Sequence, residues 1–164
     1  MDGYSIAVLT LSDTASSGSR EDLSGPLAAE LMANAGYIVS SYEVLPDDPD
    51  TVASRLISWA DTGSVDLILT TGGTGFSPRD MTPEATKAVC GREVPGIPEM
   101  LRVRSAETVP TAWLSRGTAG IRGRTLIVNL PGSAKAVREC IGILLPVLPH
   151  ALEVLCGDSG RCGT

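Results

Sequence analysis

Three apolar runs in this sequence end in small polar residues and glycine, and this pattern constrains the fold more than any other feature. The endings are Thr10–Asp13, Thr70–Gly73 and Asn129–Gly132. The run before the second ending, 66–71, is almost continuously apolar, which is typical of a parallel strand covered on both faces. The carboxyl ends of parallel strands lie at one edge of a sheet, where α/β proteins bind ligands. We therefore expect these three loops to meet at one site.

The alternation of strand and helix patterns predicts the fold class. Strands are expected at 5–12, 37–45, 66–71, 111–116 and 124–130, and helices at 26–35, 51–60, 82–89, 96–106 and 131–145. Strand–helix–strand order favours parallel pairing with right-handed crossovers. We therefore expect an α/β fold, a single three-layer domain with a mostly parallel sheet and helices on both faces. The strand at 37–45 alternates apolar and polar residues, which indicates a sheet edge.

Local signals indicate where these elements begin, bend and reverse. The stretches 13–25 and 117–123 are expected to form a loop and a turn, and Pro146 and Pro149 are expected to extend or kink the last helix. Three side chains are placed to cap helices: Asp50, Thr82 and Ser133.

The length of the chain suits one domain. With 164 residues, 43% of them hydrophobic, the chain can bury one core but hardly two. We expect a domain at 1–155 and a polar C-terminal tail at 156–164, whose role the sequence leaves open.

Charge and motif content exclude several classes of protein. The net charge of −6 and the lack of a Lys/Arg run argue against a nucleic-acid partner. No apolar stretch reaches the roughly 18 residues of a membrane span, and 1–4 lacks the basic region of a signal peptide. A soluble, cytoplasmic protein is expected. Pro78 replaces the third glycine of a dinucleotide fingerprint, and no P-loop motif occurs.

The cysteines do not indicate a metal site. Cys90, Cys140, Cys156 and Cys162 show no Cys-x-x-Cys spacing, and His150 is the only histidine. This argues against structural zinc. The first three cysteines stand in apolar surroundings and are expected to be core thiols.

The glycine-rich stretch after the strand at 66–71 predicts an anion-binding loop. Glycine lets the backbone approach a ligand closely, and successive N–H groups can surround a phosphate. The helix expected at 82–89 follows, with Pro83 and Glu84 in its first turn. A tight turn without a ligand is the alternative interpretation.

Carboxylates stand beside this loop. Asp80 follows the glycines, and Asp47 and Asp48 follow the strand at 37–45. Carboxylates that face bound phosphates require a cation between them, and Mg²⁺ is usually held by one or two carboxylates together with substrate phosphates. The alternative is turn and cap chemistry, which we favour for Asp48 and Asp50.

Five segments together resemble the Mog/MoaB family of molybdenum cofactor biosynthesis and the related molybdopterin-adenylating G domains of plants and animals. They are "VLTLSDTASSG", "LPDD", "TTGGTGFSPRDMTPEAT", "LSRGTAGIRG" and "LIVNLPGS", and the resemblance spans 6–155. It implies a molybdopterin-binding fold, a homotrimer and molybdopterin adenylyltransferase activity. In that reaction AMP passes from Mg-ATP to molybdopterin with release of pyrophosphate, and a molybdenum insertase receives the product.

The resemblance also implies roles for individual residues. Asp47 and Asp80 correspond to the functional aspartates of the family and would hold Mg²⁺. The phosphate loop would be lined by Gly72, Gly73, Thr74 and Gly75. The pterin or its phosphate would be held by Ser115, Asn129 and Ser133, and the crevice would be bordered by Ser12 and Asp13. Alternatively, Ser115 covers a sheet edge, Asn129 caps a turn and Ser133 only caps its helix. Four arginines stay open between phosphate contact and surface ion pairing: Arg79, Arg116, Arg122 and Arg124.

The implied chemistry agrees with what the residues offer. The nucleophile of adenylyl transfer is an anionic phosphate, so no strong general base is needed, and positioning with charge neutralisation dominates. The stretch 79–86 keeps the "RDxTPEAT" pattern of the active members, which favours the enzyme. The alternative is a non-catalytic molybdopterin-binding or carrier module, and the sequence leaves open whether the pathway uses molybdenum or tungsten.

Overall fold

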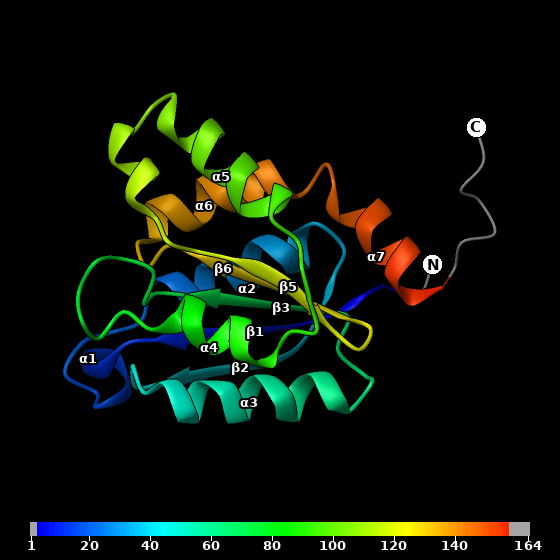
Figure 1. The fold of residues 1–164 in the computed structure, drawn as a ribbon, viewed down its shortest axis with the longest axis horizontal. Helices are drawn as coiled ribbons and strands as arrows, with labels where there is room; N and C mark the ends of the chain where they lie inside the picture. The colour runs from blue at the N-terminus through cyan, green and yellow to red at the C-terminus, as the bar shows by residue number, and fades with distance from the viewer. Residues whose placement is uncertain (1–2, 158–164) are drawn as a thin grey trace.

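A six-stranded sheet forms the centre of the protein in the computed structural model, which describes residues 3–157 (Figure 1). The predicted tail, with Cys162, lies almost wholly outside the described residues. The strands are β1 (Ser5–Leu11), β2 (Ile38–Leu45), β3 (Leu67–Thr71), β4 (Arg92–Glu93), β5 (Ala119–Arg122) and β6 (Thr125–Leu130). The helices are α1 (Asp13–Ser16), α2 (Ser24–Asn34), α3 (Pro49–Asp61), α4 (Thr82–Val89), α5 (Gly96–Ala106), the 3₁₀ helix η1 (Pro110–Leu114), α6 (Ala134–Leu144) and α7 (Leu148–Cys156).

The sheet confirms the predicted fold class. Its strand order is β2-β1-β3-β6-β5-β4, in which β2, β1, β3 and β6 run parallel, while β5 pairs antiparallel with β6 and β4 antiparallel with β5. Strand β2 lies at an edge, as its alternating pattern predicts. Strands β1, β3 and β6 are neighbours, so their carboxyl ends lie side by side.

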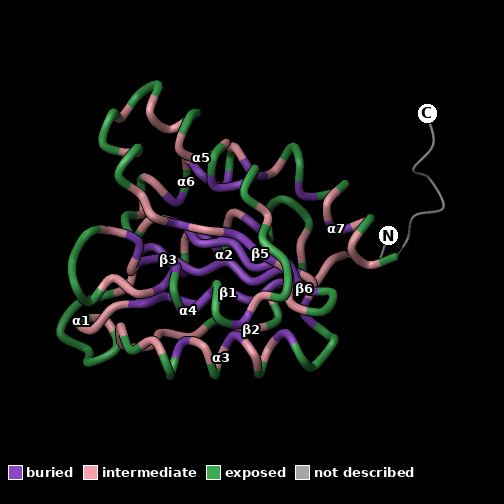
Figure 2. Tube along the Cα trace, in the orientation of Figure 1, coloured by how far each residue is buried: buried purple, intermediate pink, exposed green. Residues whose placement is uncertain are grey.

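Side chains of the sheet fill a core on each face, because successive residues of a strand point to opposite sides. Ile6 and Val8 of β1 join the core covered by α2, α5, α6 and α7, whereas Ala7 and Leu9 join the core covered by α3 and α4. The central strands β1, β3 and β6 are consequently buried, whereas the edge strands β2 and β4 and the outer sides of the helices carry exposed positions (Figure 2). These two helical layers and the sheet form the predicted three layers.

The break between the last two helices confirms the kink expected at Pro146 and Pro149. Helices α6 and α7 are bent by 65°. Among the described residues no single helix is both long and apolar enough to cross a membrane, and these two would reach that length and composition only together. Their inner side chains, such as Ile141 and Leu148, are buried in the core.

The structure contradicts the assignments between 111 and 123. The prediction of a strand at 111–116 is wrong. Most of this segment belongs to the 3₁₀ helix η1, which begins at Pro110 and in which Ala112 N–H donates to the Val109 carbonyl. The turn expected at 117–123 is instead mostly strand β5. Gly120 serves close packing, since a Cβ there would lie 2.7 Å from Cys90 Cβ, and the chain reverses only at Gly123, at φ 58°.

Two of the three expected caps are wrong. Asp48, not Asp50, caps α3 by accepting from Thr51 N–H at 2.9 Å. Thr82 is the first helical residue of α4, and Met81 before it makes no capping bond with its side chain. Ser133 caps α6 as expected. Part of the loop expected at 13–25 forms the short helix α1, and β4 was not expected.

Two of the three expected core thiols are only partly buried. Cys140 is buried, whereas Cys90 and Cys156 are half-buried. The Cys156 thiol donates to Asp66 Oδ1 at 3.2 Å.

Candidate functional site

The three strand endings meet at Gly72. Its N–H donates to the Leu130 carbonyl of β6 at 3.2 Å, and its φ is 98°. A Cβ on Gly72 would overlap the Leu11 carbonyl of β1, and a Cβ on Gly132 would lie 3.3 Å from Gly72 Cα. Thr71 donates its hydroxyl to the Pro131 carbonyl at 2.8 Å. The glycine therefore lets the ends of β1, β3 and β6 touch, and the predicted convergence is present.

The next two glycines of the loop leave room for carboxylates. A Cβ on Gly73, whose φ is 64°, would overlap the Thr82 hydroxyl and lie 3.3 Å from Asp47 Oδ1. A Cβ on Gly75 would lie 2.8 Å from Asp80 Oδ2. That same oxygen accepts from Ser77 N–H at 2.9 Å, so the loop folds back around Asp80. Both carboxylates thus lie against the glycine loop.

Successive N–H groups of the loop are available to an anion. The N–H groups of Gly73, Thr74 and Gly75 donate to no acceptor within residues 3–157. Thr74 is nevertheless buried and Gly75 half-buried. Successive N–H groups of a glycine loop that have no acceptor in the protein can surround an anion such as a phosphate.

Asp13 holds Asp47 and Arg79. Asp13 N–H donates to Asp47 Oδ2 at 3.1 Å, and Asp47 N–H donates to Asp13 Oδ1 at 3.0 Å. Arg79 donates to both oxygens of Asp13, at 3.0 and 2.8 Å. Of the two roles that the sequence left open for Arg79, the structure shows an ion pair, and its partner is Asp13.

The pKa of Asp47 is raised above its ordinary value. Burial is the largest cause, and the charges of Asp13 and Asp80 add to it, while the Asp13 N–H and Arg79 oppose it. A negative charge on Asp47 is therefore costly here without a nearby cation. Within residues 3–157 no cluster of three or more His, Cys, Asp or Glu could hold a metal ion, so any Mg²⁺ bound to these carboxylates would take its other oxygens from water or a substrate.

The side chain of Asn129 forms hydrogen bonds within the protein. Its Nδ2 donates to the hydroxyls of Thr70 and Thr86, each at 2.9 Å, and its Oδ1 accepts from Thr118 N–H at 3.2 Å. Only 3% of Asn129 is exposed. It therefore joins β6, β3 and α4, rather than presenting a free amide to a ligand.

Two of the three predicted serines, Ser115 and Ser133, lie at the edge of a cavity. Ser115 follows η1, and its hydroxyl accepts from Gly117 N–H at 3.3 Å. Ser133 accepts from Ala136 N–H at 3.2 Å as the cap of α6. Its exposed position leaves it facing both of the cavities described next.

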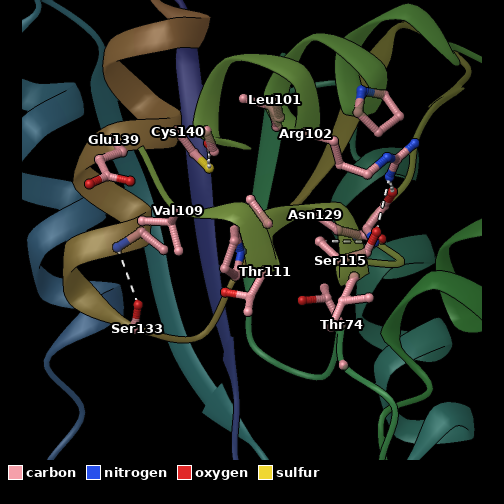
Figure 3. Close-up of a pocket in the computed structure, with 18 of the residues that line it drawn as sticks. Thr74, Leu101, Arg102, Val109, Thr111, Ser115, Asn129, Ser133, Glu139 and Cys140 are labelled. Carbon is pink, nitrogen blue, oxygen red and sulfur yellow. Dashed lines mark hydrogen bonds between the residues drawn. The ribbon is translucent and has the colours of Figure 1, made fainter. Parts of the chain in front are cut away.

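Two cavities flank the glycine loop. One, of about 400 Å³, lies between the loop, α5, η1 and the start of α6, and includes Thr74, Ser115 and Asn129 in its wall (Figure 3). The other, of about 410 Å³, lies between α1, the start of α2, Gly72 and Gly132. Ser133 lines both. The arrangement can therefore accommodate two ligands whose ends meet near the glycines.

Sequence reasoning missed the wall formed by α5 and η1. Arg102 of α5 donates to the carbonyls of Ser115 and Gly117, at 3.2 and 3.0 Å, and so fixes the cavity rim. Leu101, Thr111 and Cys140 also line this cavity (Figure 3). Burial raises the pKa of the Cys140 thiol to about 11, so it stays protonated and is a poor nucleophile. The strand-end rule could not reveal these residues, because they lie on helices.

Comparison with known proteins agrees with this geometry. Residues 7–150 match the family described as "Probable molybdopterin binding domain". The chain is 44% identical over 157 residues to the molybdopterin adenylyltransferase of Helicobacter pylori strain J99, covering 93% of this chain and 88% of that one. It is 37% identical over 153 residues to the molybdenum cofactor biosynthesis bifunctional protein of Chlorobaculum tepidum, covering 93% of this chain and 48% of that one.

A solved structure shows the same fold. The molybdopterin biosynthesis enzyme MoaB of Thermus thermophilus superposes with a TM-score of 0.89 at 48% identity, covering 94% of this chain and 97% of that one. The family match runs from β1 to the start of α7 and includes the whole glycine loop, Asp47 and Asp80. The chain therefore belongs to the molybdopterin-binding domain family of molybdenum cofactor biosynthesis.

Proposed function

We propose that this protein is a molybdopterin adenylyltransferase that uses ATP. The observation that carries the proposal is the pair of cavities that meet at a glycine loop with available N–H groups and two adjacent carboxylates. A reaction between two phosphorylated substrates needs such a meeting point. The curated relative that is 44% identical carries the same activity in its name.

The reaction places modest demands on the side chains. An oxygen of the terminal phosphate of molybdopterin attacks the α-phosphorus of ATP; the bond from that phosphorus to the oxygen bridging to the β-phosphate breaks, and pyrophosphate leaves with its electron pair. The attacking phosphate is already anionic, so no side chain has to remove a proton. The protein must align the two phosphates and offset their charge.

The loop and its neighbours divide this work. The N–H groups of Gly73, Thr74 and Gly75 bind phosphate oxygens, and Gly72 lets the loop lie directly on the ends of the strands. Ser12 borders the second cavity, Ser133 borders both, and Ser115 stands at the rim of the first. Asp13 donates its N–H to the Asp47 carboxylate and so holds that side chain in place.

Asp47 and Asp80 fit a magnesium site shared with substrate phosphates. The raised pKa of Asp47, caused by burial and by neighbouring carboxylates, indicates a position that favours a bound cation. Mg²⁺ held there by these two residues would neutralise phosphate charge. The alternative role, a carrier that binds molybdopterin without reacting it, needs neither carboxylate.

The decisive experiment incubates the purified protein with molybdopterin, ATP and Mg²⁺, and measures adenylylated molybdopterin and pyrophosphate. We expect equal amounts of both products. Asp80→Asn is expected to lower kcat by about a hundredfold or more and to leave molybdopterin affinity nearly unchanged.

Asp50→Asn is the matched control, because Asp50 is an exposed aspartate in the first turn of α3 and its substitution removes the same charge. It should retain wild-type turnover. Molybdopterin that binds without forming product would refute the enzyme and support the carrier.

We further propose that the protein acts in the cytoplasm as a homotrimer and passes its product to a molybdenum insertase. The bifunctional relative supports the transfer step, because this chain spans only 48% of it and leaves room for a second activity. Light scattering should give a particle three times the 17.0 kDa of the chain.

A further inference from the structure

Arg116 ties together the two ends of the segment between Gly75 and Asp80. Its Nε donates to the Gly75 carbonyl at 2.8 Å, and its Nη2 donates to the Asp80 carbonyl. Its own N–H donates to the Thr74 carbonyl at 2.9 Å. Arg116 alone thus holds the main chain at both Gly75, the last glycine of the phosphate loop, and Asp80, a proposed magnesium ligand.

The guanidinium has little capacity left for a substrate. Its remaining contacts go to Glu84 of α4, with Nη1 to Oε1 and Nη2 to Oε2 at 3.4 Å. This pairing lowers the pKa of Glu84, so the carboxylate stays ionised and balances the positive charge of Arg116. A residue whose donors and charge are both matched by the protein acts on the reaction through the groups it holds.

The segment that carries Arg116 is itself fixed. Arg102 binds the carbonyls on both sides of it, and Thr118 N–H donates to the buried Asn129 side chain. Asp80 is held at its carbonyl by Arg116 and at its carboxylate by Ser77 N–H. The position of the Asp80 carboxylate therefore depends on the distance that Arg116 sets between the ends of the 75–80 segment.

From this geometry we infer that Arg116 is a positioning residue for AMP transfer, which fixes the glycine loop and Asp80 without touching substrate. The inference rests on the proposed function, because it assigns Arg116 to that reaction. Lysine cannot replace it, since only the planar fork of arginine reaches two carbonyls and a carboxylate at once.

Arg116→Lys tests this directly, with Arg122→Lys as its matched control. Arg122 makes comparable bonds at the far end of α4, to both oxygens of Asp61 at 2.8 Å and to one carbonyl, that of Val89, at 3.0 Å. Arg116→Lys is expected to lower kcat by about a hundredfold while KM changes by less than about threefold. Arg122→Lys should leave both unchanged.

Two further measurements separate positioning from a general loss of structure. Guanidinium ion added at millimolar concentration should restore part of the activity of Arg116→Ala, whereas Asp80→Asn should gain nothing. Amide deuterium exchange at Ser77 and Asp80, whose N–H groups are hydrogen-bonded within the 75–80 segment, should rise about tenfold in Arg116→Lys, with exchange in β3 unchanged.

The outcomes distinguish this inference from the proposed function. An inactive wild-type protein would refute the transferase, and the exchange measurement would still decide whether Arg116 fixes the loop. An active wild type with unchanged kcat in Arg116→Lys, or exchange at Ser77 and Asp80 equal to that of the wild type, would overturn the inference.

Discussion

At the scale of single residues, glycine and carboxylate positions explain each other. Gly73 and Gly75 lie so close to Asp47 and Asp80 that a methyl group on either would meet a carboxylate oxygen. The strand-end pattern allowed both sets of residues to be predicted. The sequence could not show the partners of Arg79 and Arg116, because those contacts cross 66 and 41 positions of the chain.

Gly72→Ala is expected to destabilise the protein by about 2 kcal/mol or more, because the left-handed backbone and the Leu11 carbonyl both oppose a Cβ. Gly36→Ala is the control, with φ 93° and open space around its Cβ position. It should cost about 1 kcal/mol. Urea unfolding of both variants measures the difference, and equal losses would contradict a role for the Leu11 contact.

At the scale of elements, periodicity predicted the strands and helices that carry the two cores. Periodicity failed to predict segments whose structure depends on contacts with distant parts of the chain. Residues 119–122 contain glycine yet form β5, because they pair with β6 and pack on Cys90. The cavity wall on α5 and η1 was missed for the same reason. Which side of α5 faces the cavity depends on how this helix packs against α6.

The start of α3 offers a test at this scale. Asp48→Ala should lower the thermal midpoint, because the N–H of Thr51 loses its acceptor. Asp50→Ala should lower it less, since that side chain contributes only a favourable charge in the first turn. Calorimetry of the two variants decides which aspartate is the cap; a larger loss for Asp50→Ala would contradict the structure.

At the scale of the whole molecule, the site opposes stability. The pKa of Asp47 is raised in the folded protein, mainly by burial and then by neighbouring carboxylates. Folding therefore favours the protonated form, and this carboxylate costs stability as pH rises through its folded-state pKa. Such a cost is expected where a cation and phosphates belong.

Asp47→Asn should consequently raise the thermal midpoint near neutral pH while abolishing turnover. The gain should shrink in acid, below the folded-state pKa, where the wild-type carboxylate is already neutral. Thermal unfolding followed over a pH series measures both effects. A variant less stable than the wild type at neutral pH would show that Asp47 contributes more through its bond with Asp13 N–H than its burial and the neighbouring carboxylates cost.

The contact of three strand ends at Gly72 also determines how the site meets its ligands. The loop begins at a buried residue hydrogen-bonded to the centre of the sheet, so its first peptide is ordered before any ligand arrives. A ligand that binds there loses its own freedom of motion but has little backbone entropy to remove from the protein. Binding should therefore be fast and accompanied by only a small rearrangement, and selectivity should come from the shape of the two cavities.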